Sequence, residues 1–226
     1  MSNNRIIRTP ANQQIPKIMA EMKTAADTLE EIGWGVSVFG SARIRPGSPY
    51  YELSVALGER LAKAGLPVIA GGGPGIMEAA NKGAFKAGGT SVGLNIKLPR
   101  EEQNNQYQTH SLMFDYFYSR KATFFMHSVA YISLPGGWGT LDELFEVLTL
   151  VQTRKVPPAP IVLIGTSFWA GLIDWVRDKQ LGNKLISPQD MDLFLVTDDL
   201  DEVMAHIETF CAKFHDRCRF EPALPE

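Results

Sequence analysis

The sequence predicts an α/β fold in which one doubly wound parallel sheet carries helices on both faces. Short apolar segments alternate with longer segments of helical periodicity along the whole chain. Most of the apolar segments are continuous, without alternating polar residues, which is typical of strands buried on both sides. Three glycine- or serine-bearing turns follow such segments, and sheets of this kind bind ligands at the carboxyl ends of their strands.

The composition favours one domain with neither a membrane nor a nucleic-acid partner. The chain has 226 residues, 45% of them hydrophobic, and shows no linker or internal repeat, so we expect residues 1–226 to form a single domain. The net charge is −3 and no long basic block occurs, which argues against nucleic-acid binding. No apolar run approaches the ~20 residues of a membrane-spanning helix. Residues 1–15 lack an apolar signal core, so we expect a cytoplasmic protein.

Cysteine and histidine give no sign of a metal site. Cys211 and Cys218 lack the spacing of a metal-binding pair, and the four histidines are scattered along the chain. We expect both cysteines to be free thiols and the protein to bind no metal.

The first half of the chain predicts a leading helix followed by alternating strands and helices. Apolar residues recur at helical spacing up to Gly33, which ends the leading helix, and the polar residues 1–14 before it are expected to be flexible. In order, we expect a helix over 15–32, a strand over 34–39, a helix over 50–64, a strand over 66–70, a helix over 76–87, a strand over 90–96, and a short strand or extended segment over 111–117.

The second half continues the alternation. The apolar run at residues 129–134 predicts a buried strand, and a helical pattern follows it until about Thr153. Residues 215–226 are expected to be flexible. In order, we expect a helix over 118–128, the strand over 129–134 with its helix, a strand over 161–165, a helix over 168–179, a short helix or turn over 187–190, a strand over 193–196, and a helix over 199–214.

A glycine-rich turn joins the strand at 129–134 to its helix and contains Gly136, Gly137 and Gly139. These glycines can take positive φ and let another molecule approach the backbone. Free N–H groups at a helix start attract phosphate. The alternative is an ordinary tight turn closed by a capping box between Thr140 and Glu143.

Two other turns at strand ends, Gly40-Ser41 and residues 71–75, can converge with this turn on one crevice. Known nucleotide motifs do not fit them. The dinucleotide pattern would place Glu78 where its third glycine belongs, and Asn95 instead of an acid near the end of the next strand. Neither a P-loop nor a Gly-x-Ser-x-Gly elbow is present. A mononucleotide or sugar-phosphate site remains.

Arg120, Lys121 and Glu143 add chemistry to this crevice. The Arg-Lys pair lies among aromatic residues and can meet a phosphate and a base, although such a pair can also be a solvated helix start. Glu143 in a first helical turn would stabilise an empty helix but repel a phosphate. It fits better beside a ribose, where positive charge develops as an N-glycosidic bond breaks.

Together these motifs resemble the LONELY GUY (LOG) family, in particular its bacterial type II branch. Residues 135–143 match the PGGxGTxxE motif and Arg120-Lys121 match the family's Arg-Lys pair. Residues 71–81 and 93–99 are similar to the type II branch, and the similarity extends over about 34–207. Glu78 stands where shorter relatives have glycine, which argues against assuming plant-like specificity.

The resemblance implies a Rossmann-like homodimer or higher homo-oligomer with sites near the subunit interface. It also implies a phosphoribohydrolase that converts a nucleoside 5′-monophosphate, such as a cytokinin riboside monophosphate or AMP, to free base and ribose 5-phosphate without a cofactor. The family's catalytic arginine and glutamate fall on Arg120 and Glu143. Its nucleotide-contacting positions fall on Glu101, Lys121, Gly137, Trp138, Gly139, Thr140 and Thr149, and the converging turns add Ser41, Gly72, Gly73 and Gly136 as expected substrate-binding residues.

Other functions are weaker alternatives, among them an interaction module with a vestigial site, which the two intact motif halves disfavour. Some relatives are labelled lysine decarboxylases, but no segment marks a Schiff-base lysine with a pyridinium partner. A non-catalytic nucleotide or molybdenum-cofactor carrier could use the same crevice. A carrier does not need the pair of Arg120 and Glu143, which therefore favours the enzyme.

Overall fold

The strands form one parallel sheet, as the sequence predicts. The computed structural model describes residues 10–98 and 104–213. Within these residues seven parallel strands lie in the order β4-β3-β2-β1-β5-β6-β7, which confirms the predicted fold class. The strands are β1 (Gly35–Phe39), β2 (Val68–Ala70), β3 (Ser91–Ile96), β4 (His110–Phe114), β5 (Ser128–Ser133), β6 (Ile161–Leu163) and β7 (Leu195–Val196).

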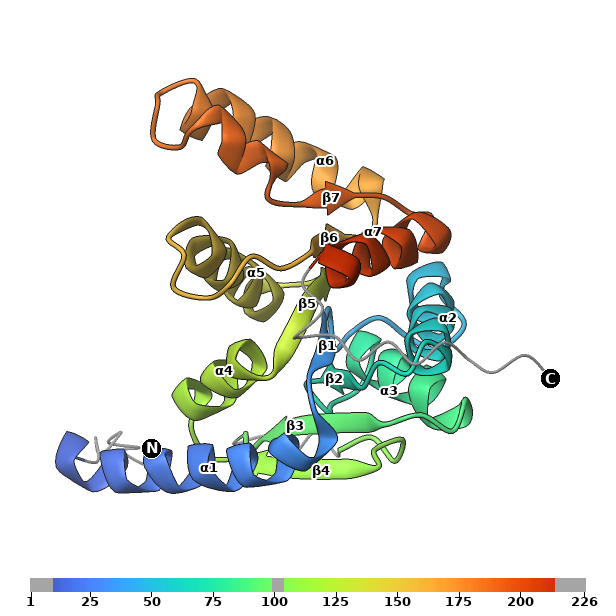
Figure 1. The fold of residues 1–226 in the computed structure, drawn as a ribbon, viewed down its shortest axis with the longest axis vertical. Helices are drawn as coiled ribbons and strands as arrows, with labels where there is room; N and C mark the ends of the chain where they lie inside the picture. Colours follow the sequence, from blue (N-terminus) through green and yellow to red (C-terminus); the bar gives the residue numbers. More distant parts are fainter. Residues whose placement is uncertain (1–9, 99–103, 214–226) are drawn as a thin grey trace, which may run out of the picture.

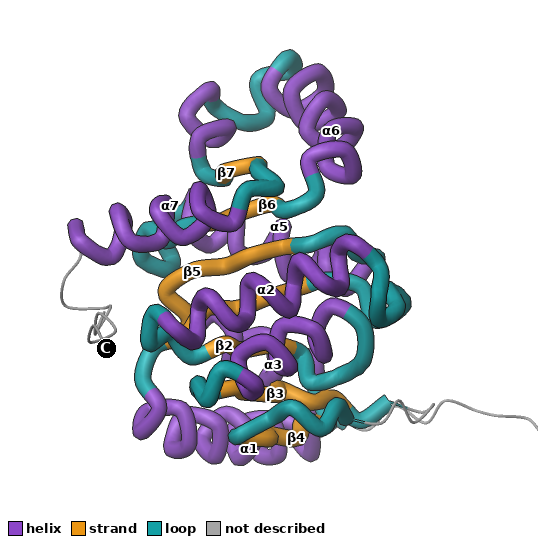
Figure 2. Tube along the Cα trace, turned by 90° about the vertical axis from the view of Figure 1, so that its right-hand side faces the viewer, coloured by secondary structure: helices purple, strands orange, loops and turns teal. Residues whose placement is uncertain are grey.

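Helices cover both faces of the sheet (Figure 1), and Figure 2 looks onto the layer that contains α2 and α3. Successive strand residues point to opposite faces, so each face has its own core: Val36 and Val38 pack in one, Phe39 and Tyr131 in the other. The first core is covered by α2 (Pro49–Lys63), α3 (Ile76–Lys86) and α7 (Leu200–Lys213), the second by α1 (Ala11–Ile32), α4 (Phe117–Met126), α5 (Trp138–Gln152) and α6 (Thr166–Trp175).

The strand order reverses beside β1. This strand pairs with β2 on one side and with β5 on the other. The chain leaves β1 through α2 toward β2, and it leaves β5 through α5 toward β6, in the opposite direction along the sheet. The helices that follow β1 and β5 therefore lie on opposite faces of the sheet and leave a crevice at its carboxyl edge, where ligands of such sheets bind.

Helices α2 and α3 pack with their backbones in close approach. A Cβ atom at Gly58 would lie 2.2 Å from the Ala80 carbonyl oxygen, and one at Gly83 would lie 2.0 Å from the Val55 carbonyl oxygen. A side chain at either position would force the helices apart, because protein interiors have no spare volume. This packing holds α3, whose first residue Ile76 borders the turn after β1.

Several element boundaries differ from the prediction. Helix α1 begins at Ala11, directly after Pro10, and contains Pro16. Its start was predicted too late because the first residues of the helix are mostly polar and do not contribute to the apolar pattern. Helix α6 ends at Trp175 and continues as a π-helix over Val176–Leu181. The expected short helix or turn is a 3₁₀ helix over Pro188–Asp192, with a capping box between Ser187 and Asp190.

Cys211 in α7 is disulfide-bonded, so the free thiol expected at this position is wrong. Sequence spacing does not show which cysteines approach each other in the fold. Cys218 lies outside the described residues, as do residues 1–9 and 215–226, whose flexibility stays a prediction. Among the helices of the described ranges, none is both long and apolar enough to cross a membrane.

Candidate functional site

Three turns converge at the carboxyl edge of the sheet. The Ser41 N–H donates to the Pro135 carbonyl oxygen (3.1 Å), and the Ser41 carbonyl accepts from the Ile76 N–H (3.0 Å). The turn after β1 is therefore hydrogen-bonded both to the turn after β5 and to the start of α3. Hydrogen bonds between the main chains therefore fix these turns relative to one another.

The converging turns enclose a cleft of about 490 Å³. Its polar side chains come from the turn after β1, from the segment between β3 and β4, from α4 and from the first turns of α5, and apolar side chains complete the lining. The lining residues are Gly40, Ser41, Ala42, Arg43, Gly71, Gly73, Met77, Ile96, Leu98, Asn104, Phe117, Arg120, Gly137, Trp138, Gly139, Thr140 and Glu143.

Arg120 extends from α4 into this cleft and is 6% exposed. Its Nε donates to the Leu94 carbonyl oxygen (2.6 Å) and its Nη2 to the Gly71 carbonyl oxygen (3.1 Å). These bonds to the ends of β3 and β2 hold the guanidinium in one orientation. Burial lowers the pKa of Arg120 and the neighbouring Glu143 opposes this effect, but an arginine stays protonated in proteins.

Glu143 lies opposite Arg120 on α5, and its side chain is 14% exposed. Its Oε1 is 3.9 Å from Nη1 of Arg120, which is within ion-pair range but longer than a hydrogen bond. Burial raises the pKa of Glu143 to about 7, assisted by the negative charges of Asp142 and Glu146 and opposed by Arg120 and Lys121. The carboxyl group therefore changes its charge near neutral pH.

The helix that carries Glu143 starts earlier than predicted. Gly137 is its N-cap and makes no side-chain hydrogen bond, while Thr140 already lies inside the first turn. The alternative of a capping box between Thr140 and Glu143 therefore does not hold, because Thr140 is not the N-cap of this helix. Within the described chain, no acceptor bonds the N–H groups of residues 138–140, which begin the helix along the cleft.

The positive φ angles predicted for the three glycines of this turn are not found. None of Gly136, Gly137 and Gly139 has a positive φ. A Cβ at Gly136 would collide with Thr140 at 2.1 Å, whereas a Cβ at Gly137 or Gly139 would meet nothing within 4 Å. The fold alone does not require glycine at these last two positions, but their missing side chains keep the wall of the cleft open.

Some residues predicted to bind substrate do not line the cleft. Gly72 and Gly136 belong to the turns but do not line it. Lys121 forms ion pairs with Asp142 (2.8 Å) and with Glu146 on α5. Burial alone would lower the pKa of Lys121, but these two partners outweigh it and raise the pKa.

Thr149 does not line the cleft either. Thr149 donates to the Phe145 carbonyl oxygen (2.7 Å) and borders a cavity of about 220 Å³ between α5 and α6. Glu101 lies outside the described residues. Ser41, Gly73, Gly137, Trp138, Gly139 and Thr140 do line the cleft, as do Arg120 and Glu143.

Several residues of the cleft were not predicted from the sequence. Arg43 follows Ser41 by two positions, and this spacing was a usable signal. Asn104 lies in a polar, irregular segment and carries no such signal. Met77, Ile96, Leu98 and Phe117 form the apolar lining and belong to patterns that also predict core residues.

Glu78, which stands at the position of the third glycine in the dinucleotide pattern, does not line the cleft. It accepts a hydrogen bond from the Tyr51 hydroxyl (2.6 Å) on α2. Burial and this contact raise the pKa of Tyr51. Glu78 therefore joins α3 to α2 and leaves the cleft unchanged. No group of three or more metal-ligating side chains occurs within residues 10–98 and 104–213.

Comparison with known proteins gives a consistent result. The model of the family described as "Possible lysine decarboxylase" matches residues 77–207. The chain is 28% identical to cytokinin riboside 5′-monophosphate phosphoribohydrolase LOG3 of Arabidopsis thaliana over 186 residues, which cover 80% of this chain and 85% of the relative. It is 27% identical to the cytokinin riboside 5′-monophosphate phosphoribohydrolase of Rhodococcoides fascians over 179 residues, covering 77% and 89%.

Solved structures share the fold. The structural-genomics target TM1055 superposes with a TM-score of 0.59 at 26% identity, covering 78% of this chain and 99% of that one. A molybdenum-cofactor carrier protein from Chlamydomonas reinhardtii superposes with a TM-score of 0.58 at 23% identity, covering 80% and 99%. At that identity the second likeness concerns the fold alone.

Proposed function

Because the chain belongs to the LOG family, whose model matches residues 77–207, we propose that it is a nucleoside 5′-monophosphate phosphoribohydrolase. The substrate is a cytokinin riboside monophosphate or a related nucleotide such as AMP, and the products are the free base and ribose 5-phosphate. The observation that carries this proposal is the pair of Arg120 and Glu143, 3.9 Å apart in a cleft beside an uncapped helix N-terminus.

The chemistry of the cleft fits the parts of such a nucleotide. The N–H groups at the start of α5 bind the 5′-phosphate, because they lack acceptors and the helix dipole favours an anion. The open wall at Gly137 and Gly139 lets the phosphate approach the backbone. The apolar lining by Met77, Ile96 and Phe117 accommodates the base.

Glu143 supplies the catalytic charge. In hydrolysis the bond between the base nitrogen and C1′ breaks with its electron pair leaving on the base, while water adds its hydroxyl to C1′ and its proton goes to the base. The sugar carries positive charge in between, and the carboxylate of Glu143 stabilises it. Arg120 lowers the pKa of Glu143 against the effect of burial and so favours the charged form.

The runner-up function is a carrier for a nucleotide or the molybdenum cofactor. The shared fold with a molybdenum-cofactor carrier supports it. The buried pair of Arg120 and Glu143 argues against it, because holding a buried carboxylate is costly and binding alone does not require one.

The test is an assay of the purified protein with AMP, isopentenyladenosine monophosphate and a wider panel of nucleoside monophosphates, with free base separated by chromatography. We expect stoichiometric free base and ribose 5-phosphate from at least one nucleotide. A panel without turnover, together with a ligand that stays bound through purification, would instead establish the carrier.

We also propose that the protein forms a homodimer or a larger homo-oligomer. Large apolar side chains are exposed mainly on the layer of α1, α4, α5 and α6, whereas on α2, α3 and α7 Phe85 is the only one within the described residues. Exposed apolar surface of this extent marks an interaction site. The exposed residues of the first layer are Ile15, Met19, Phe117, Tyr118, Met126, Trp138, Phe145, Phe168 and Trp175.

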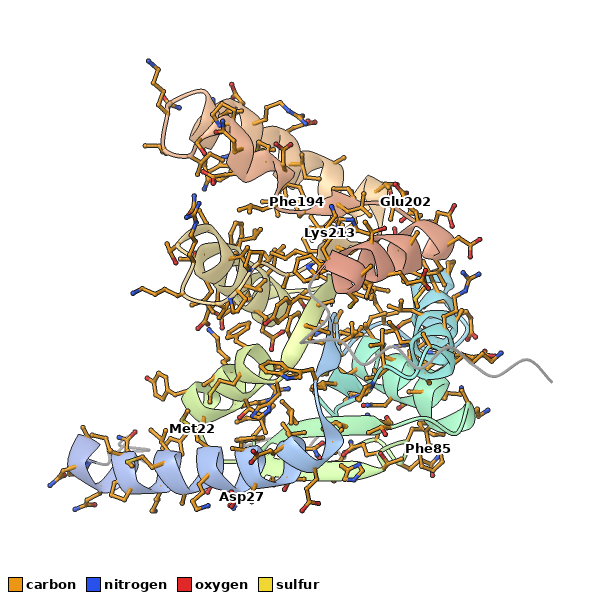
Figure 3. All side chains as sticks on the ribbon, in the orientation of Figure 1. Met22, Asp27, Phe85, Phe194, Glu202 and Lys213 are labelled. Carbon is orange, nitrogen blue, oxygen red and sulfur yellow. The ribbon has the colours of Figure 1, made fainter. Side chains whose placement is uncertain are left out.

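Helix α1 supports the same proposal. Its second half packs Ala25 and Leu29 into the core, but residues 11–20 are almost all exposed and extend beyond α4 (Figure 1). Figure 3 shows Met22 on the side of α1 that faces α4, with Asp27 on the opposite side. Ile15 and Met19 continue the apolar stripe of Met22 at helical spacing, and an isolated helical segment of this length is marginal in water. A second copy would cover the stripe.

A further inference from the structure

We propose that Arg43 is the cation that binds the 5′-phosphate. This inference rests on the proposed function, because it assigns one contact of the proposed substrate. Neither the Arg-Lys pair nor the glycine-rich turn includes Arg43. The residue lies in the turn after β1 and lines the cleft.

The other cations near the cleft are already engaged. Arg120 donates to the carbonyl oxygens of Leu94 and Gly71 and faces Glu143. Lys121 lies outside the cleft, in ion pairs with Asp142 and Glu146. An incoming phosphate would have to compete with these partners for either charge.

Arg43 has no such partner. Its backbone N–H donates to the Ser41 hydroxyl (3.1 Å), but its guanidinium makes neither an ion pair nor a hydrogen bond within the described chain. The side chain is exposed and so free to turn into the cleft. Its five donors match two phosphate oxygens at once, which a lysine ammonium cannot do.

The position of Arg43 suits the phosphate end of the cleft. The turn that carries it is bonded through Ser41 to Pro135, the residue just before the glycine-rich turn at the start of α5. The guanidinium and the free N–H groups of α5 therefore border the same end of the cleft. A phosphate placed there meets a cation on one side and a helix N-terminus on the other.

The charge balance of the cleft points to the same residue. Its described ionisable side chains are Arg43, Arg120 and Glu143. With Glu143 ionised they sum to one positive charge, and without Arg43 they sum to zero. A nucleotide phosphate carries a charge of about −1.5 to −2 at neutral pH, so Arg43 supplies the net attraction.

The experiment compares Arg43→Gln with Arg45→Gln. Arg45 is exposed in the same turn but does not line the cleft, so it controls for the loss of one positive charge from the surface. Calorimetry measures binding of inorganic phosphate and ribose 5-phosphate, and kinetics measure KM and kcat for the hydrolysed nucleotide. Arg43→Lys is the third variant.

We expect Arg43→Gln to weaken phosphate binding and raise KM about 10- to 100-fold, with kcat changed far less, because charged hydrogen bonds to the phosphate are lost. Arg43→Lys should recover part of the affinity, and Arg45→Gln should match the wild type. Equal phosphate affinity in the two Gln variants, or no phosphate binding by the wild type, overturns the assignment.

The proposed function fails separately. It fails when the wild-type protein hydrolyses no nucleotide, and the phosphate titrations still decide the role of Arg43 in that case. Since Arg43 is exposed and its side chain bonds nothing in the described chain, all three variants should unfold at the wild-type temperature.

Discussion

Arg120 and Glu143 face each other across 3.9 Å although they stand on successive helices and are held from different sides. Carbonyl oxygens of two strand ends fix Arg120, whereas the hydrogen bonds of the described residues include none to the carboxylate of Glu143. Hydrogen bonds thus hold the side chain of Arg120 in place, whereas the carboxylate of Glu143 has no such bond within the described residues. Substitutions at the two positions should therefore differ in their effects on catalysis and on folding.

Replacing Glu143 by Gln should lower kcat by about 10²–10³, the usual cost of removing one group that stabilises transition-state charge. The amide keeps the shape of the carboxyl group, so nucleotide affinity should change little. Steady-state kinetics on the hydrolysed nucleotide measure both values. Glu146→Gln, on the outer side of α5, is the matched control, and an equal loss in both variants would refute the catalytic role.

The activity should depend on pH through Glu143. Burial raises the pKa of this carboxyl group to about 7, and the ionised form is the active one, so kcat/KM should rise with pH and level off above about 8. The nucleotide phosphate also ionises near pH 6. The residual activity of Glu143→Gln should therefore keep only this second dependence, and an unchanged profile in the variant would contradict the assignment.

The same pKa predicts a pH-dependent cost in stability. The folded protein holds the Glu143 proton up to about pH 7, whereas an unfolded glutamate releases it near its ordinary value of 4.5. Between these values the folded state binds more protons, so stability falls as pH rises. Compared with Glu143→Gln, the wild type should lose about 1–3 kcal/mol of its free energy of unfolding between pH 5 and 8. Chemical denaturation of both proteins at pH 5 and at pH 8 measures this loss. An equal change in the free energy of unfolding of the wild type and of Glu143→Gln would contradict the prediction.

Substitutions of the glycines at the start of α5 should affect nucleotide affinity and folding stability separately. A Cβ at Gly139 meets no protein atom, so Gly139→Ala should keep or raise the unfolding temperature, because alanine favours a helix by up to about 1 kcal/mol. Nucleotide affinity should fall about tenfold or more as the methyl group displaces the phosphate. Gly136→Ala is the opposite case: its Cβ collides with Thr140, so this variant should mainly lose stability, by about 1–3 kcal/mol.

The exposed stripe on α1 should control assembly. Glutamate at both Ile15 and Met19 would place two charges in the proposed interface, and we expect a smaller mass by light scattering coupled to gel filtration. Gln13→Glu adds a charge to the other side of the helix and should leave the mass unchanged. A double variant with the wild-type mass would show that α1 takes no part in the assembly.

The sheet could be predicted well from the sequence because its strands are buried on both faces. A strand such as β5 is apolar from Val129 to Ile132 and buried at every residue, which is typical of a strand covered by helices on both sides. Helix ends were harder. The start of α1 is polar and contains Pro16, and the start of α5 contains Gly139. The intrinsic helix propensity of these residues is low, so the sequence predicted later helix starts. Packing of the following turns stabilises both helices nevertheless.

The candidate site was predicted in part. Arg120 and Glu143 could be identified by their motifs, but Lys121 could not be placed correctly from its position beside Arg120. Consecutive residues of a helix point about 100° apart, so Lys121 turns to Asp142 and Glu146 instead of the cleft. Arg43 was missed although it follows Ser41, which was predicted to bind substrate, by only two positions.

The place of β1 between β2 and β5 has a consequence for synthesis of the protein. β1 ends at Phe39 and β5 at Ser133. At a translation rate of about 5–20 residues per second, β5 is completed roughly 5–20 s after β1. During that interval one edge of β1 stays open, and an open edge is a template for pairing with other chains. A nascent chain that stalls before β5 is synthesised would keep this edge of β1 unpaired and would lack Glu143. Protection of β1 from aggregation therefore requires synthesis of the chain through β5.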